Sequence, residues 1–156
     1  MLDTIYRGNK NDYGSLNYLQ ILFHNLHCQA VDSIDESSNA DTVPGQILEI
    51  CQKKAAAVKN SQDFDLIIVS DTMLQDPDSD GLAMGKANDA IQAAAMLHRL
   101  SGRRHRVWSA TGIFHQGEWE FHLNQSIVEF ENLTDEMMMR ISKLLPAKKR
   151  GYYSEY

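Results

Sequence analysis

The sequence predicts an α/β domain with a mixed central β-sheet flanked by helices. In several segments apolar residues recur at intervals of three and four, which is typical of amphipathic helices. Between two such segments lies a short apolar run, Asp65–Ser70, whose β-branched residues suit a strand buried on both faces. Two further strands flank the turn Gln116-Gly117, so a hairpin is expected beside the helix-connected strands.

Length, charge and cysteine content restrict the class of protein. A chain of 156 residues favours a single domain, residues 1–156, with a sizeable core. The formal net charge of −6 argues against a nucleic-acid polymer as partner, although a small anionic ligand needs only a few local cations. No apolar run reaches the roughly 20 residues of a membrane helix, and no signal-peptide core is present. We therefore expect a cytoplasmic protein without a membrane partner, in which the isolated Cys28 and Cys51 are buried thiols.

The first half of the chain predicts two helices. Residues 1–14 are rich in turn-forming residues and form at most a short strand before a loop. Ser15 can cap a first helix with apolar positions at Leu16, Leu19, Leu22, Phe23 and Leu26. The second helix is expected from about Val43 to Lys59, with Pro44 in its first turn and one face formed by Ile47, Cys51, Ala55 and Val58. Lys53 and Lys54 lie toward its end, where cations suit the helix dipole, and solvated surface charge is the simpler interpretation of both.

After the buried strand we expect a long loop, two more helices and the hairpin. The third helix begins at Asn88 or Asp89 and ends before Gly102, with Ile91, Ala94, Ala95, Leu97 and Leu100 toward the core. The hairpin strands are expected at Arg106–Phe114 and Glu118–Phe130. Thr134 caps the last helix, whose methionines at 137–139 are interpreted as core filling.

Acidic residues that follow strand candidates suggest a site. Asp71 comes directly after the buried strand, and ligands of open α/β sheets bind outside the carboxyl ends of strands. Asp35-Glu36 follows a weaker strand candidate in the same way. Two such acids could hold a divalent metal that bridges phosphates, while Lys54 and Lys86 neutralise phosphate charge. A structural cap is an equally acceptable interpretation of Asp71.

Other constellations are weaker. Asp76, Asp78 and Asp80 imitate the start of a calcium loop, but Pro77 interrupts it and Ala87 stands where the final acid belongs, so we expect a solvated acidic loop. His24 and His27, one helical turn apart, lack the further ligands of a zinc site.

At these residues the sequence resembles the Maf family, the septum-formation-inhibitor-like nucleoside triphosphate pyrophosphatases. The family pattern G-A-D-T, G-K-P and A-x-x-M-L-x-x-L-S-G-R-x-H-x-V-x-T-G is similar to Val69–Thr72, Gly85–Ala87 and the segment 93–112. Asp35-Glu36, Lys54–Val58 and Val128–Glu136 match further family motifs. The resemblance covers about Ser15 to Ser154 and implies a Maf/ITPase-like fold.

The resemblance also implies an activity and its residues. Members hydrolyse a nucleoside triphosphate to the monophosphate and pyrophosphate with a divalent metal, Mg²⁺ or Mn²⁺. It implies Asp71 as the catalytic acid that activates water or holds the metal, and Glu36 as its metal-binding companion. Substrate contacts would come from Ser15, Lys54, Lys86 and Lys149.

The sequence departs from the family at two places. The family opens with S-x-S-P-R-R, whereas residues 13–18 read Tyr-Gly-Ser-Leu-Asn-Tyr and keep only Ser15. Neither Asn nor Tyr replaces a bidentate arginine at a phosphate. The chain also ends at Tyr156, where the family continues, so we expect a divergent, C-terminally short member whose sheet edge is covered in a homodimer. The alternative to the enzyme is a catalytically inactive nucleotide-binding or cell-division regulatory protein.

Overall fold

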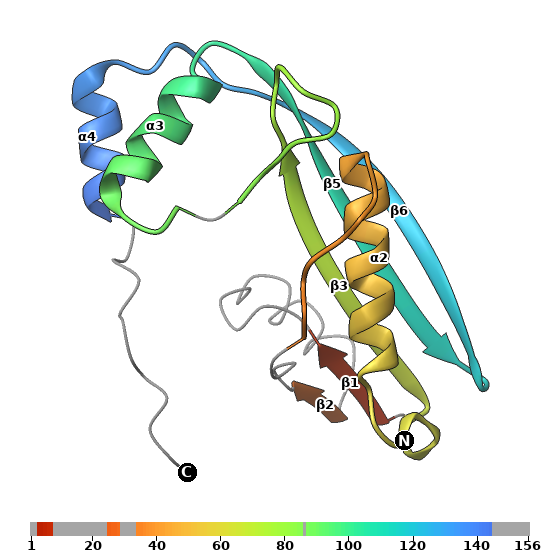
Figure 1. Cartoon of the computed structure of the whole chain (residues 1–156). Helices are drawn as coiled ribbons and strands as arrows, with labels where there is room; N and C mark the ends of the chain where they lie inside the picture. Colours follow the sequence, from red (N-terminus) through yellow and green to blue (C-terminus); the bar gives the residue numbers. More distant parts are fainter. Residues whose placement is uncertain (1–2, 8–24, 29–33, 86, 145–156) are drawn as a thin grey trace. The chain divides into compact units, whose positions relative to one another are not determined.

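The computed structural model describes residues 3–7, 25–28, 34–85 and 87–144 (Figure 1). Contacts divide the chain into two compact units: Met1–Met73 with Val107–Ser126, and Leu74–Arg106 with Ile127–Tyr156. The prediction of a single domain is not decided by this division and stays a prediction. No helix in the described ranges combines the length and apolar character needed to cross a membrane.

The sheet is mixed, as predicted. Its strand order is β2-β1-β3-β5-β6, and β4 pairs with β3 outside this path. The strands are β1 (Asp3–Arg7), β2 (Asn25–Cys28), β3 (Leu66–Gln75), β4 (Ala83–Met84), β5 (Arg104–His115) and β6 (Glu118–Glu129). β1 runs parallel to β2 and β3, with Thr4 opposite Leu66, whereas β4 runs antiparallel to β3. Leu26 lies in β2, so the predicted first helix does not extend that far; most of that helix falls outside the described residues.

The first unit is built around α2 (Val43–Ala56), which lies against β3 and β5 (Figure 1). Thr42 caps the helix through a hydrogen bond from the Gly45 N–H, and Pro44 occupies the first turn, as predicted. One core cluster joins helix and sheet through Ile47, Cys51, Ala55, Ile67, Val69, Ala110 and Phe114. Cys51 is fully buried, as predicted, and this burial raises the pKa of its thiol to about 11.

Gly112 lies at a close approach between two side chains of this unit. A Cβ atom at this position would lie 2.8 Å from both a Val69 methyl and the Phe121 ring. The strands can therefore bring these two side chains together only because residue 112 has none. The hairpin turn that follows has positive φ at Gln116 (52°) and Gly117 (90°), as the tight two-residue connection requires.

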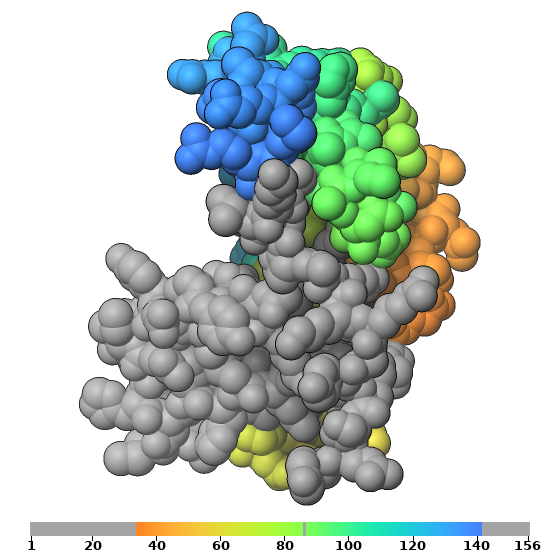
Figure 2. Space-filling view, turned by 90° about the vertical axis from the view of Figure 1, so that its left-hand side faces the viewer, coloured from red at the N-terminus to blue at the C-terminus, as the bar shows by residue number. Residues whose placement is uncertain are grey.

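In the second unit, α3 (Ala90–Leu100) packs beside α4 (Asp135–Leu144), as Figure 2 shows in green and blue. Thr134 caps α4 through the Met137 N–H, as predicted. Asp89, one of the two residues expected at the start of α3, caps that helix through the Gln92 N–H. Ala93, Leu100 and Met138 are buried. The prediction for Ile91 was wrong, since its side chain is 82% exposed, and Met137 and Met139 are exposed too.

The acidic segment after β3 is the predicted solvated loop only in part, since the Asp78 and Asp80 side chains are 51% and 86% exposed but Asp76 is not. Asp76 is buried and accepts two hydrogen bonds from the Arg99 guanidinium, and Asp78 pairs with Arg103. Asp80 lies 3.1 Å from the Arg106 guanidinium. The hydrogen bonds from Arg99 hold the pKa of Asp76 below its usual value. We define Asp76, Asp78, Asp80, Arg99, Arg103 and Arg106 as the Asp–Arg cluster; its charges are neutralised within the protein rather than by calcium.

Candidate functional site

Asp71 lies within β3, not at its end as predicted. Four further residues continue the strand to Gln75, because Leu74 and Gln75 pair with β4. Side chains alternate between the two faces of a strand, so Asp71 shares a face with Ile67 and Val69. That face packs on α2, and the Asp71 side chain, 23% exposed, therefore faces the helix.

Lys54 comes from the facing side of α2. It lies one turn beyond Ile50 and Cys51, which are both buried. Because Lys54 lies on the same apolar face of the helix, it is buried as well. The Lys54 Nζ donates a hydrogen bond of 2.8 Å to the Asp71 Oδ2, and its side chain is only 8% exposed. A lysine buried to this degree needs a partner, so the interpretation of Lys54 as a solvated surface charge is wrong.

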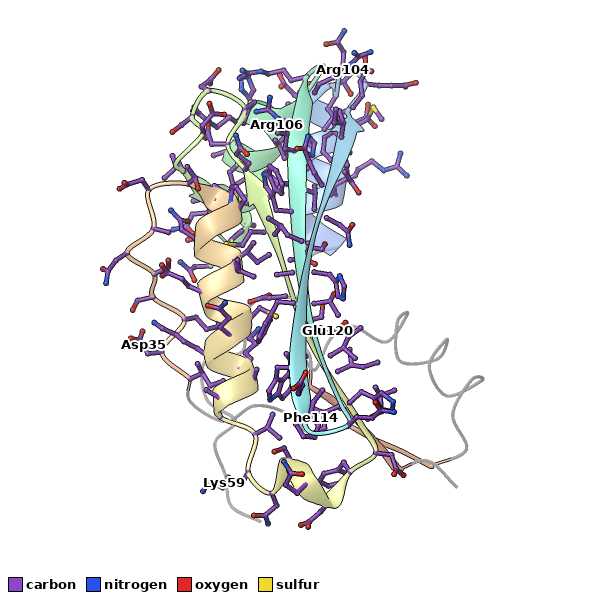
Figure 3. All side chains as sticks on the ribbon, turned by 90° about the vertical axis from the view of Figure 1, so that its right-hand side faces the viewer. Asp35, Lys59, Arg104, Arg106, Phe114 and Glu120 are labelled. Carbon is purple, nitrogen blue, oxygen red and sulfur yellow. The ribbon has the colours of Figure 1, made fainter. Side chains whose placement is uncertain are left out.

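Glu36 reaches the same ammonium group from the segment that precedes α2. Its Oε1 lies 3.5 Å from the Lys54 Nζ, and its side chain is 63% exposed. Glu36, Lys54 and Asp71 thus form a carboxylate–ammonium–carboxylate triad within the first unit. Figure 3 shows the neighbouring Asp35 on this segment, alongside α2.

The triad is chemically suited to a divalent cation held together with a phosphate ligand. Mg²⁺ takes oxygen ligands and is commonly bound by one or two carboxylates, substrate phosphates and waters. Glu36 and Asp71 supply two carboxylates that already share one cationic group, and Glu36 is open to solvent. Within the described ranges no three His, Cys, Asp or Glu residues gather as a metal cage, so protein ligands alone would not complete the coordination.

The structure thus brings together three of the predicted site residues. Ser15, Lys86 and Lys149 lie outside the described residues, and their roles stay predictions. Sequence reasoning missed Ser37 and the contacts beside Glu36: Asp35 accepts hydrogen bonds from Ser37, and Lys53 donates to the Ser37 carbonyl. The spacing Asp-x-Ser, which favours a side-chain-closed turn, could have indicated this arrangement.

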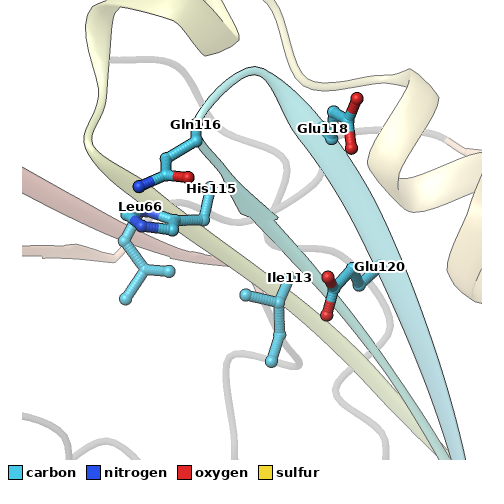
Figure 4. Close-up of a pocket in the computed structure, with 6 residues that line it drawn as sticks. All are labelled: Leu66, Ile113, His115, Gln116, Glu118 and Glu120. Atoms are coloured by element: carbon cyan, nitrogen blue, oxygen red, sulfur yellow. The ribbon is translucent and has the colours of Figure 1, made fainter.

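A separate hollow of about 600 Å³ lies in the same unit, between the start of β3 and the hairpin (Figure 4). It is lined by Leu66, Ile113, His115, Gln116, Glu118 and Glu120. Among the described residues that line it there are two carboxylates and no lysine or arginine, so this described lining does not suit a polyphosphate. The triad, and not this hollow, is the candidate site for an anionic ligand.

Comparison with known proteins shows the family of this chain. A family profile described as "Maf-like protein" matches residues 16–153, which is most of the chain. The chain belongs to the Maf family. The Maf-like segment includes all three triad residues.

Three Maf relatives, each named dTTP/UTP pyrophosphatase, are similar to this chain. The relative from Pyrococcus abyssi is 33% identical over 105 residues, 67% of this chain and 54% of its own length. That from Porphyromonas gingivalis is 33% identical over 130 residues, covering 80% and 64%. The Bacillus velezensis relative is 31% identical over 140 residues, covering 88% and 70%. The chain thus spans between about half and two thirds of the length of most of these Maf relatives.

Solved structures include a more distant neighbour, a HAM1 protein from Coxiella burnetii. It is 17% identical to this Maf-like chain, has a TM-score of 0.48, and the match covers 83% of this chain and 73% of that one.

Proposed function

We propose that this Maf-like chain is a nucleoside triphosphate pyrophosphatase. It would hydrolyse an NTP or dNTP to the monophosphate and pyrophosphate with Mg²⁺ or Mn²⁺. The observation that carries the proposal is the convergence of Glu36 and Asp71 on the buried Lys54. The names of the relatives, dTTP/UTP pyrophosphatase, favour a pyrimidine nucleotide as substrate.

The chemistry needs a base, charge neutralisation and a held phosphate chain. Water attacks the α-phosphorus, and the bond to the oxygen that bridges the α- and β-phosphates breaks, so pyrophosphate leaves. A divalent cation, when bound, would neutralise phosphate charge and lower the pKa of water. The Asp71 carboxylate would accept the proton of the attacking water, while Glu36 would complete the oxygen ligands. Lys54 would balance the two carboxylates and contact phosphate oxygens. Lys86, Lys149 and Ser15 are the further phosphate contacts we propose.

The direct test is pyrophosphate release across a nucleotide panel that includes UTP, dTTP, CTP and ATP, with Mg²⁺ or Mn²⁺. Wild type is compared with Asp71→Asn, and Asp63→Asn, an exposed residue away from the triad, is the matched control. We expect release by wild type and by the Asp63 variant, with loss of at least about 100-fold in Asp71→Asn, since general-base assistance contributes about 10²–10⁴-fold. Equal activity in all three proteins would contradict the role of Asp71.

The second candidate function is nucleotide binding without turnover. It is favoured by Asn17 and Tyr18, which stand where the family has its two phosphate-binding arginines. Calorimetry with UTP and Mg²⁺ separates the two candidates. A complex that forms without pyrophosphate release supports nucleotide binding without turnover, whereas a complex that releases pyrophosphate supports the enzyme.

A further inference from the structure

The segment that carries Glu36 is held on both sides of this residue. The Asp35 carboxylate accepts a hydrogen bond of 2.9 Å from the Ser37 backbone N–H and one of 2.8 Å from the Ser37 hydroxyl. These two bonds close a turn with Glu36 at its centre. A side chain on a closed turn samples fewer positions than one on an open loop, because its backbone is fixed.

The turn at residues 35–37 is also held against α2. The Lys53 Nζ donates a 2.6 Å hydrogen bond to the Ser37 carbonyl and lies 3.9 Å from the Asp35 Oδ2. One residue further, the Ser38 hydroxyl donates to the Glu49 carboxylate on the same helix. Successive residues of a helix point about 100° apart, so the adjacent Lys53 and Lys54 reach different parts of one segment. Lys53 holds its backbone, and Lys54 contacts the Glu36 side chain.

We infer that Asp35, Ser37 and Lys53 form a brace that positions the Glu36 carboxylate opposite Asp71. This inference rests on the proposed function and adds three positioning residues to it, none of which needs to touch the substrate. The brace is exposed: Lys53 is 41% exposed, and Asp35 more so. Exposed ion pairs contribute little to global stability, so its effect is expected on the site and not on folding. Outer partners that orient metal ligands commonly change affinity or activity by about 10–100-fold when removed.

The test uses the full chain with Asp35→Ala, Ser37→Ala and Lys53→Met. Asp35→Asn retains an acceptor for the Ser37 N–H and serves as the conservative rescue. Glu129→Ala is the matched control, because it breaks an exposed ion pair of 2.8 Å with Arg104 that lies outside the brace. Glu36→Gln gives the effect of losing the positioned group itself. Each variant is measured for kcat, for KM with UTP, for the Mn²⁺ concentration at half-maximal rate, for Mn²⁺ binding by EPR without nucleotide, and for Tm.

If the brace positions Glu36, Asp35→Ala weakens Mn²⁺ binding and raises the half-maximal Mn²⁺ concentration by about 10-fold. Its Tm and its KM for UTP at saturating Mn²⁺ stay near the wild-type values. Asp35→Asn recovers part of the loss, and Glu129→Ala behaves as wild type. The brace is overturned if Asp35→Ala and Lys53→Met bind Mn²⁺ as wild type does while Glu36→Gln loses Mn²⁺ binding. That result leaves the proposed function standing. A wild type that neither binds Mn²⁺ nor releases pyrophosphate overturns both proposals. A loss of Mn²⁺ affinity in the brace variants that is accompanied by a lowered Tm overturns the brace alone, because the loss then follows from reduced stability.

Discussion

Lys54 is the residue on which the candidate site depends. It is an almost fully buried ammonium group between two carboxylates, only one of which is also substantially buried. Removal of one member of a buried ion pair leaves the other without compensation, and this cost commonly exceeds what the pair contributed. The pair therefore couples the stability of the first unit to the charge of its site.

Replacement of Lys54 by Met should lower the free energy of unfolding by about 1–3 kcal/mol, because the partly buried Asp71 loses its hydrogen-bond donor. Urea unfolding measures the change, and Lys53→Met, at an exposed neighbouring position, should stay within about 0.5 kcal/mol. The double variant Lys54→Met/Asp71→Asn should recover part of the loss, since the only carboxylate then left without Lys54 is that of the exposed Glu36. Additive losses in the double variant would show that the two side chains do not interact.

Asp76 should make stability depend on acid pH. Its pKa is lowered, chiefly by the hydrogen bonds from Arg99, from the usual value of 3.8. The stabilisation is thus fully present above the pKa that Asp76 has in the unfolded chain. It is lost as pH falls through the lower pKa that Asp76 has in the folded protein. Below about pH 4, the urea midpoint of wild type should fall more steeply than that of Asp76→Asn. Asp63→Asn is the control, and superimposable profiles for wild type and Asp76→Asn would contradict the prediction.

At the scale of elements, β3 is the decisive strand. The sequence predicts its apolar first half, but Asp71 and Thr72 interrupt the apolar run and suggest an end. The strand continues because Leu74 and Gln75 pair with β4, and the Thr72 hydroxyl lies 3.1 Å from that of Ser109 on β5. Polar residues can thus extend a strand when a neighbour satisfies them, and a single sequence does not show which neighbour that is.

Local rules explain which elements could be predicted. Caps and turn residues act within a few positions, so Thr134, Asp89 and Gly102 were assigned correctly to helix ends. The exposure of Ile91 and the burial of Asp76 depend on packing between distant segments, which periodicity alone cannot specify. The same holds for the site. Asp71 and Lys54 were predicted from motif and charge, whereas the brace around Glu36 required the contacts of α2 with the preceding segment.

Gly112 limits how closely β3, β5 and β6 can be repacked. Gly112→Ala places a Cβ 2.8 Å from Val69 and Phe121, and overpacking of this kind should destabilise by about 1–3 kcal/mol. Gly85→Ala is the control, because nothing lies within 4 Å of its added Cβ. Denaturant midpoints measure the stability of both variants. The double variant Val69→Ala/Gly112→Ala should lose less stability than the sum of the losses of the two single variants. Equal stability of the Gly112 and Gly85 variants would mean that β3, β5 and β6 accommodate the added methyl group without a loss in the free energy of unfolding.

At the scale of the whole molecule, the negative net charge and the local cation at the site have to be considered together. With a net charge of −6, the chain as a whole repels polyanions, so binding of a nucleotide relies on local lysines and a divalent cation. The predicted homodimer and the predicted absence of a nucleic-acid partner stay predictions at this scale.

Ligand binding should therefore stabilise the protein only when the cation is present. A non-hydrolysable UTP analogue with Mg²⁺, at about 100 times its Kd, should add about 2.7 kcal/mol and raise Tm by about 5–10 °C. Differential scanning fluorimetry measures the shift, with EDTA and Asp71→Asn as controls. An equal shift in EDTA would show that the nucleotide binds without a metal.

The unequal burial of Lys53 and Lys54 has a practical consequence for work in crude extracts. A water-soluble acylating reagent should reach the amine of Lys53, whose side chain is 41% exposed, sooner than that of Lys54, whose side chain is 8% exposed. The two lysines are adjacent in the chain, so one proteolytic peptide can contain both. Lys54 reports on the triad, and Lys53 serves as its internal standard. The ratio of their labelling, read by mass spectrometry, would follow the opening of the triad without purification of the protein.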